Sequence, residues 1–190
     1  EAGNADDTVV GVGEQLKKVL EEKYHVAVCH DLSVYDMQDG KEDRNKAYSQ
    51  AAVAVQNLLD EHPSIEVTID LHRDGVPDNV HLETEINGKK TAKIMFLNGL
   101  CRNSNGDVND FAQNPNLSDN LAFSLQLQLK AKAYFPELVR HIYLRAYRYN
   151  LHFKPRSLLV EVGAQNNTVA EAKNAMEPLA DILYAVLSGK

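Results

Sequence analysis

Two polar motifs, each at the end of an apolar stretch, contain the residues whose types are best suited to chemistry. The first is DLHRD at residues 70–74, after a run rich in β-branched residues that begins at Ile65. The imidazole of His72 is of the kind that commonly binds zinc, and a neighbouring carboxylate often orients such a ligand. A histidine satisfied by hydrogen bonds at a strand end fits the same pattern, so the motif alone leaves both interpretations open.

The second motif is LLVEVGAQNN at residues 158–167, where Glu161 ends an apolar run. A carboxylate in this position is either a paired structural acid or a catalytic one. The catalytic role is open to it because burial beside apolar side chains raises the pKa of a carboxyl group toward that of a general base. Gln165 and Asn167 could hydrogen-bond a peptide substrate, or could belong to the loop and the N-cap of the next helix.

Two further side chains are candidates for substrate binding. Arg73 could hold an anionic group or a peptide carbonyl, although a salt bridge to a neighbouring aspartate is the commoner role. His152, in RYNLHFKP before the Glu161 run, could line a site. The spacing from His72 to Asn79 also matches the H-R-D-x-x-x-x-N loop of protein kinases. The sequence has no D-F-G triplet and no complete glycine-rich loop, which excludes that class.

The elements that must position these motifs alternate between helix and strand. Apolar residues recur at helical spacing over residues 8–23 and 47–59, and the second helix is expected to end before Pro63. Asn87-Gly88 between two extended stretches predicts a hairpin within residues 83–98. The other predicted strands lie at residues 26–30, 65–71, 142–149 and 158–162.

The C-terminal half carries helix-capping signals. Ser118 is expected to cap a helix that follows the polar loop 101–117, and Thr168 with Glu171 fits a capping box for the last helix, which Pro178 should kink. Strands that alternate with helices predict an α/β fold with a mostly parallel central sheet and helices on both faces. In such sheets ligands bind beyond the carboxyl ends of the strands, where both motifs lie.

Composition narrows the class of protein. The chain has 190 residues, which favours a single domain, with 44% hydrophobic and 25% charged residues. Its net charge is −7 and it has no basic stripe, so no nucleic-acid partner is expected. No apolar stretch approaches the roughly 20 residues of a membrane helix. The two cysteines make no disulfide framework, and Cys29, in an apolar run, is expected to be buried.

Several stretches, in order along nearly the whole chain, resemble the family of stage II sporulation protein P, the cell-wall amidases of spore-forming Firmicutes. The most specific are IDLHRD and LLVEVGAQNNT, and the others include TVVGVGEQL, AVCHDLSVYD and DRNKAYSQA. The resemblance implies a zinc-peptidase-like α/β fold and N-acetylmuramoyl-L-alanine amidase activity. It also implies zinc as the cofactor, His72 as a metal ligand and Glu161 as the catalytic acid/base.

The chain departs from the family pattern at its beginning. Family members start this domain with a strand that ends in a His-Thr-His-like motif, followed shortly by a glutamate, and these supply the other zinc ligands. Apart from a faint match at Glu1-Ala2, the sequence contains no such segment, and one histidine cannot build a catalytic zinc site. We therefore expect residues 1–190 to be a single amidase catalytic domain that lacks its N-terminal metal-binding strand, and the natural protein to be longer there.

The resemblance also bears on partners and location. Peptidoglycan is the expected partner, together with sporulation proteins. An extracytoplasmic location is implied, facing the cell wall of a Gram-positive bacterium and attached to the membrane through an upstream anchor. The alternative function is that of a metal-free, non-catalytic domain of the same fold that binds peptidoglycan or serves as a scaffold. A hydrolase of this fold that acts on a different amide is the third possibility.

Overall fold

The computed structural model describes residues 4–35, 37–38, 41–42, 44–110 and 112–190. The Glu1-Ala2 match to the glutamate of the family lies outside these residues. The first described element is a short 3-10 helix, η1 (Ala5–Asp7), which leads into α1 (Val9–Tyr24). Thr8 caps α1, because its hydroxyl accepts a hydrogen bond from the N–H of Val10.

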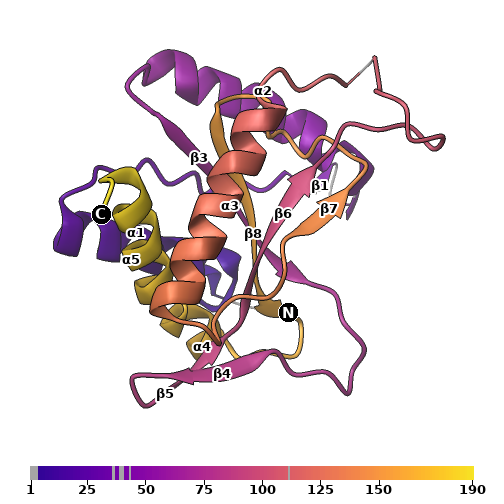
Figure 1. Ribbon diagram of the computed structural model, residues 1–190. Coiled ribbons are helices and arrows are strands. Elements are labelled where there is room, and N and C mark those ends of the chain that lie inside the picture. Colours follow the sequence, from indigo (N-terminus) through magenta and orange to yellow (C-terminus); the bar gives the residue numbers. More distant parts are fainter. Residues whose placement is uncertain (1–3, 36, 39–40, 43, 111) are drawn as a thin grey trace.

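A four-stranded sheet forms the centre of the fold (Figure 1). Its strands lie in the order β3 (Val67–Asp74), β8 (Arg156–Ala164), β6 (Ile94–Gly99) and β7 (Tyr143–Arg145). β3 with β8 and β6 with β7 are parallel pairs, whereas β6 and β8 are antiparallel. The prediction of an α/β fold with a mostly parallel sheet is confirmed.

One face of the sheet packs on the main hydrophobic core. The helices that cover this face are α1, α3 (Leu117–Tyr134), α4 (Val169–Asn174) and α5 (Met176–Leu187) (Figure 1). Burying a large apolar side chain here stabilises the fold by roughly 1.5–3 kcal/mol. Alternate residues of β6 and β8 point into this core and are almost inaccessible to water: Ile94, Phe96, Leu158, Val160 and Val162.

α2 (Arg44–Glu61) covers part of the other face. Its Tyr48 stacks on the ring of His72. The neighbour of His72 in β3, Leu71, packs against the main core, so His72 points to the opposite side. The same face carries a smaller apolar cluster of Leu97, Leu151 and Leu159. The sheet therefore has helices on both faces, as predicted.

The predicted hairpin forms outside the central sheet, from β4 (Glu83–Ile86) and β5 (Lys89–Ala92). Asn87 and Gly88 both have positive φ, 52° and 76°, as a tight two-residue turn requires. The extended stretch that follows is not part of the hairpin, since residues 94–99 form β6 of the central sheet. A second small antiparallel pair joins β1 (Met37–Gln38) to β2 (Lys41–Glu42).

The prediction of a strand at residues 26–30 is wrong. His25 ends α1 in the left-handed conformation, with φ 55°. The N–H of Val26 then bonds back to the carbonyl of Leu20 in that helix, at 3.1 Å. Because this backbone hydrogen bond is made to the helix, the segment is extended without joining a ladder.

The burial predicted for Cys29 is also wrong. Val26 and Val28 pack against the main core, and in an extended segment the side chain of the next residue points the other way. Cys29 is therefore exposed, whereas Cys101 is buried, and both thiols are free.

The last helix is interrupted where a kink was predicted. Thr168 and Glu171 form the expected capping box at the start of α4. Pro178 has no N–H to donate to the carbonyl of Asn174, so the helical ladder cannot run continuously past this point. The consequence is a break between α4 and α5 rather than a bend within one helix.

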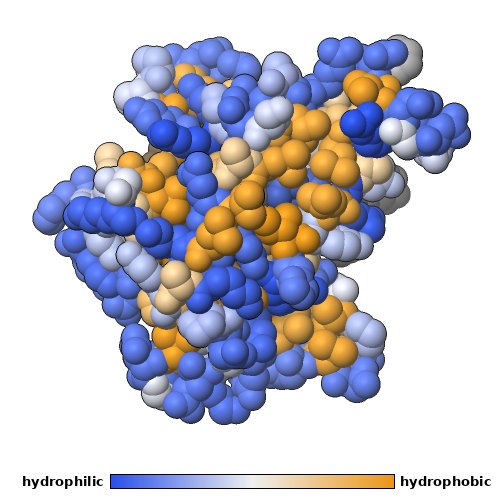
Figure 2. Space-filling view, viewed as in Figure 1, coloured by the Kyte–Doolittle hydropathy of each residue, from blue (hydrophilic) through white to orange (hydrophobic). Residues whose placement is uncertain are grey.

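Part of the surface is apolar. Figure 2 shows hydrophobic residues gathered over the region of α3 and β7. In the described part of the chain, no helix combines the length and the apolar character needed to cross a membrane. The large apolar side chains exposed on α3 and β7 are Leu125, Leu129, Tyr134, Tyr143 and Leu144.

Candidate functional site

His72 of β3 and Glu161 of β8 lie side by side. The two residues are partners in the parallel register, so their side chains point to the same face of the sheet. It is the face opposite the main core, because Val160 and Val162 on either side of Glu161 point into that core. The structure thus brings together the two residues for which the sequence predicts chemistry.

Asp70 and Tyr48 hold the imidazole of His72. Its Nε2 lies 3.0 Å from Asp70 Oδ1, and the Tyr48 ring stacks parallel to it, with centroids 6.2 Å apart and planes at 3°. Burial lowers the pKa of His72, but the hydrogen bond with Asp70 and the charges of Asp70 and Glu161 outweigh that effect and raise it. The side chain remains 39% exposed, so a ligand can reach the ring.

One carboxylate oxygen of Glu161 is buried and unpartnered. Its Oε2 has no hydrogen-bond partner among the described residues. Burial raises the pKa of Glu161, and nearby aspartates reinforce that shift against the opposing charge of His72. Buried polar atoms almost always have a partner, so this oxygen is where a water, a cation or a substrate group is expected.

Arg73 is engaged with the protein's own backbone. Its Nη2 donates to the carbonyl of Ala164, at 2.7 Å, and to that of Asn167. A salt bridge with a neighbouring aspartate was the alternative role for Arg73. Asp74 pairs with Arg140 instead, at 2.6 Å. Arg73 therefore holds the turn after β8, and binding a substrate through Nη2 would require it to release a carbonyl.

Gln165 and Asn167 also make contacts within the protein. The Oε1 of Gln165 accepts a hydrogen bond from the N–H of Val76 at 3.0 Å, and its Nε2 donates to the carbonyl of the same residue. Asn167 is buried, and its Oδ1 accepts from the N–H of Ala164 at 2.8 Å. Gln165 is exposed beyond the carboxyl end of β8, so it is the more accessible of the two.

His152 lies in the segment between β7 and β8. Its Nδ1 is buried and has no hydrogen-bond partner in the part of the chain that the structure describes. Burial lowers the pKa of His152, and the charge of Arg148 lowers it further. Its ring packs on Phe153, with centroids 4.3 Å apart. Its role in substrate binding stays a prediction.

Sequence reasoning missed Tyr48 and Gly163. No local pattern marks Tyr48, whose contact with His72 arises only in the folded chain. Gly163 has φ 61° and lies where the register of β3 and β8 shifts. A Cβ there would lie 2.6 Å from the Oδ1 of Asn167. The signal was available, because a glycine inside a strand pattern often marks a bulge.

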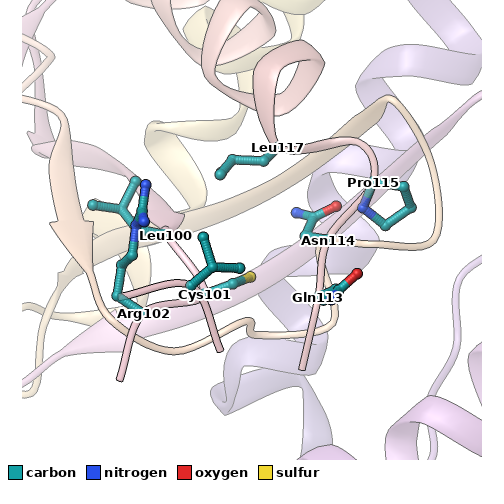
Figure 3. Close-up of a pocket in the computed structure, with 8 residues that line it drawn as sticks. Leu100, Cys101, Arg102, Gln113, Asn114, Pro115 and Leu117 are labelled. Atoms are coloured by element: carbon teal, nitrogen blue, oxygen red, sulfur yellow. The ribbon is translucent and has the colours of Figure 1, made fainter. Parts of the chain in front are cut away.

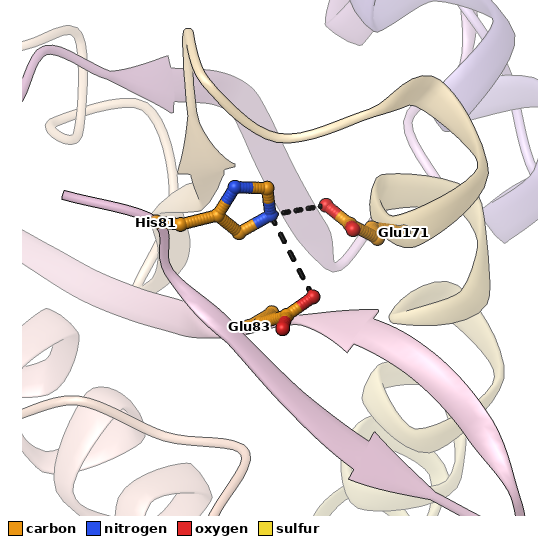
Figure 4. Close-up of side chains that lie close together, drawn as sticks. All are labelled: His81, Glu83 and Glu171. Atoms are coloured by element: carbon orange, nitrogen blue, oxygen red, sulfur yellow. Dashed lines mark hydrogen bonds and ion pairs between the residues drawn. The ribbon is translucent and has the colours of Figure 1, made fainter. Parts of the chain in front are cut away.

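A second group of ionisable residues lies apart from His72 and Glu161. It consists of His81, Glu83 and Glu171 (Figure 4). Their ligand atoms lie within 4.8 Å of one another, so they could hold a divalent cation. His81 Nε2 is 2.9 Å from Glu171 Oε2, which also accepts from the N–H of Thr168 and from Asn167 Nδ2. Burial alone would raise the pKa of Glu171, but its three hydrogen bonds lower it to about 2. As described, the group joins the loop before β4 to the start of α4.

A small cavity of about 220 Å³ lies at the end of β6 (Figure 3). Because β6 runs antiparallel to β8, this end of β6 lies beside the start of β8 rather than beside Glu161. The cavity is therefore separate from the pair of His72 and Glu161. Its lining consists of Leu100, Cys101, Arg102, Val108, Gln113, Asn114, Pro115 and Leu117.

Comparisons with known proteins show which family the chain matches. The family model of stage II sporulation protein P (SpoIIP) matches residues 1–184. The CwlD amidase from Clostridioides difficile, solved in complex with the GerS lipoprotein, is similar with a TM-score of 0.56 and 12% identity, over 95% of this chain and 82% of that chain. The N-acetylmuramyl-L-alanine amidase Ami1 from Mycobacterium smegmatis is similar with a TM-score of 0.49 and 14% identity, over 94% of this chain and 72% of that chain. No curated protein sequence matches the chain.

The structural likeness and the family match support different conclusions. At 12% identity, the likeness to CwlD shows that the two proteins share a fold. The family match spans nearly the whole chain and includes both the DLHRD and the LLVEVG motifs. It confirms the resemblance drawn from those motifs. This chain belongs to the stage II sporulation protein P (SpoIIP) family.

Proposed function

We propose that this chain is a zinc-dependent N-acetylmuramoyl-L-alanine amidase that acts on bacterial peptidoglycan, with residues 1–190 forming one catalytic domain. The observation that carries the proposal is the register partnership of His72 and Glu161, together with a buried oxygen on Glu161 that has no hydrogen-bond partner in the described ranges of the chain. Membership of the family supports it. An imidazole beside the carboxylates of Asp70 and Glu161 is a donor set that fits zinc.

In the proposed mechanism, His72 holds the metal, and Asp70 orients the imidazole through their 3.0 Å contact. When bound, zinc polarises the scissile carbonyl and lowers the pKa of water. Glu161 takes a proton from the attacking water as the water oxygen adds to the lactyl carbonyl carbon. The raised pKa of Glu161 favours its holding that proton and then giving it to the L-alanine nitrogen as the C–N bond breaks.

A catalytic zinc site takes three protein ligands and an open position. In the proposal, His72 supplies one of these ligands. Action on peptidoglycan implies an extracytoplasmic location, and attachment to the membrane is part of the proposal. CwlD was solved with a lipoprotein bound to it, and a sporulation protein as partner is part of the proposal here.

The test is digestion of purified sacculi by the full natural protein, with detection of the newly freed amino groups of L-alanine. Glu161→Gln should lower the rate at least about 100-fold, because it removes the general base. Glu66→Gln, which changes a carboxylate that is 76% exposed, is the matched control and should leave the rate unchanged.

Equal rates for the wild type and Glu161→Gln would end the catalytic assignment. A protein that binds sacculi but frees no ends would support the alternative, a non-catalytic peptidoglycan-binding or scaffold domain. Release of ends other than L-alanine would show that a different amide is cut.

A further inference from the structure

We propose that Tyr147, Tyr149 and Tyr48 form an aromatic strip that binds sugar residues of the glycan strand beside the catalytic pair. The inference rests on the proposed function and assigns one part of the substrate to one side of the site. The rings contact one another in order and end at His72. Their centroid separations are 5.8 Å for Tyr147 and Tyr149, 5.5 Å for Tyr149 and Tyr48, and 6.2 Å for Tyr48 and His72.

The strip lies on the same face of the sheet as Glu161. Tyr149 packs against the small apolar cluster that contains Leu159. Leu159 is two residues before Glu161 in β8, and alternate residues of a strand share a face. The strip therefore extends from His72 toward the amino-terminal end of β8.

The strip is held in place before any ligand binds. Asn150 Nδ2 donates to the carbonyl of Tyr48 at 2.7 Å, which ties α2 to the segment that carries the other two rings. Tyr149 and Asn150 both have positive φ, 54° and 58°. The backbone of Tyr147 approaches Gly99 so closely that a Cβ on Gly99 would lie 2.1 Å from the Tyr147 carbonyl oxygen. Such costly conformations persist only where the surroundings fix them, and they cluster at ligand sites.

The chemistry on the two sides of His72 and Glu161 indicates that a sugar stacks on the tyrosine rings. Tyr147 is 66% exposed. A pyranose ring presents a face of C–H groups, which suits the negative face of an aromatic ring, and its hydroxyl groups suit the tyrosine O–H groups. On the other side, beyond the carboxyl end of β8, lies the exposed side chain of Gln165, whose amide already pairs with the backbone of Val76 as it would with a peptide. The bond cut in the proposed reaction joins the sugar part of the substrate to its peptide part.

The test measures binding apart from cleavage, in the Glu161→Gln variant of the full natural protein. Two probes are used: intact sacculi and a synthetic stem peptide that lacks sugar. Adding Tyr147→Ala should weaken binding to sacculi roughly three- to tenfold, the usual worth of one aromatic contact, and leave binding to the peptide unchanged. Tyr147→Phe should retain most of the sacculus binding. Tyr134→Ala, which removes a 49% exposed ring on α3, is the matched control and should bind as the parent does.

Unchanged sacculus binding by Tyr147→Ala would overturn the proposal, as would an equal loss with the sugar-free peptide. Circular dichroism of each variant separates a binding effect from loss of fold. The outcome is independent of the digestion assay. If Glu161→Gln digests sacculi as the wild type does, the proposed function fails, while a sacculus-specific loss in Tyr147→Ala still establishes the strip.

Discussion

The Nε2 of His72 lies 3.0 Å from the Oδ1 of Asp70, two residues earlier on the same strand. A carboxylate in this position fixes the orientation of a metal-binding imidazole and strengthens it as a ligand. Asp70→Asn should therefore lower the zinc affinity of the full natural protein roughly 10- to 100-fold, measured by equilibrium dialysis. His72→Ala should lower it further. Asp60→Asn, on the exposed side of α2, should leave it unchanged, and equal affinities for all three variants would contradict the assignment of His72.

Gly163 occupies a backbone conformation and a space that other residues do not tolerate. Gly163→Ala should reduce the free energy of unfolding by roughly 1–3 kcal/mol, measured with urea, because φ is 61° and the new Cβ would lie 2.6 Å from Asn167 Oδ1. Gly106→Ala is the control for the conformation alone, since φ is 87° and nothing lies within 4 Å of its Cβ position. The Gly163 variant should lose more stability than the control; the reverse order would show that the strand bulge accommodates a side chain.

Arg73 offers a way to separate a structural role from substrate binding. Arg73→Lys replaces a guanidinium that bonds two backbone carbonyls with a point charge, so the free energy of unfolding should fall by about 1–2 kcal/mol. KM for sacculus fragments should stay the same. Arg156→Lys, at a 48% exposed side chain paired with Glu66, is the control and should change neither quantity. A raised KM with unchanged stability would instead favour the substrate-binding role.

Glu171 makes stability depend on pH in a defined direction. Its pKa in the folded protein is about 2, below its ordinary value of 4.5, so the ionised form stabilises the fold above about pH 5. Glu171→Gln should therefore cost up to about 3 kcal/mol at pH 7. The difference from the wild type should shrink as pH falls through 4.5 toward 2, in urea titrations at each pH. A constant difference over that range would show that Glu171 contributes by packing rather than by charge.

The sequence predicted the part of the site that depends on strands and their ends. The β-branched run before His72 and the apolar run before Glu161 both form strands of the four-stranded sheet, and they meet in register because the carboxyl ends of parallel strands lie together. The segment at residues 26–30 has the same apolar alternation, yet it does not pair. Apolar alternation reports which side chains are buried, and it cannot report where backbone hydrogen bonds go.

The contacts that the sequence could not predict join residues far apart in the chain. Tyr48 on α2 reaches His72 on β3, and an aromatic residue at a helical position gives no sign of its distant partner. Arg73 bonds backbone carbonyls, which every residue possesses, so no pattern of side chains points to them. Gly163 is the exception, because a glycine within an otherwise apolar strand is itself a signal of irregular backbone.

The attachment of α2 has a consequence for access to the site. No described residue of this helix belongs to the main hydrophobic core, while its Tyr48 covers the imidazole of His72 and is tied by its carbonyl to Asn150. Elements with few buried apolar contacts open at a lower free energy than the core does. The free energy needed to detach α2 is therefore expected to be lower than that needed to open the four-stranded sheet.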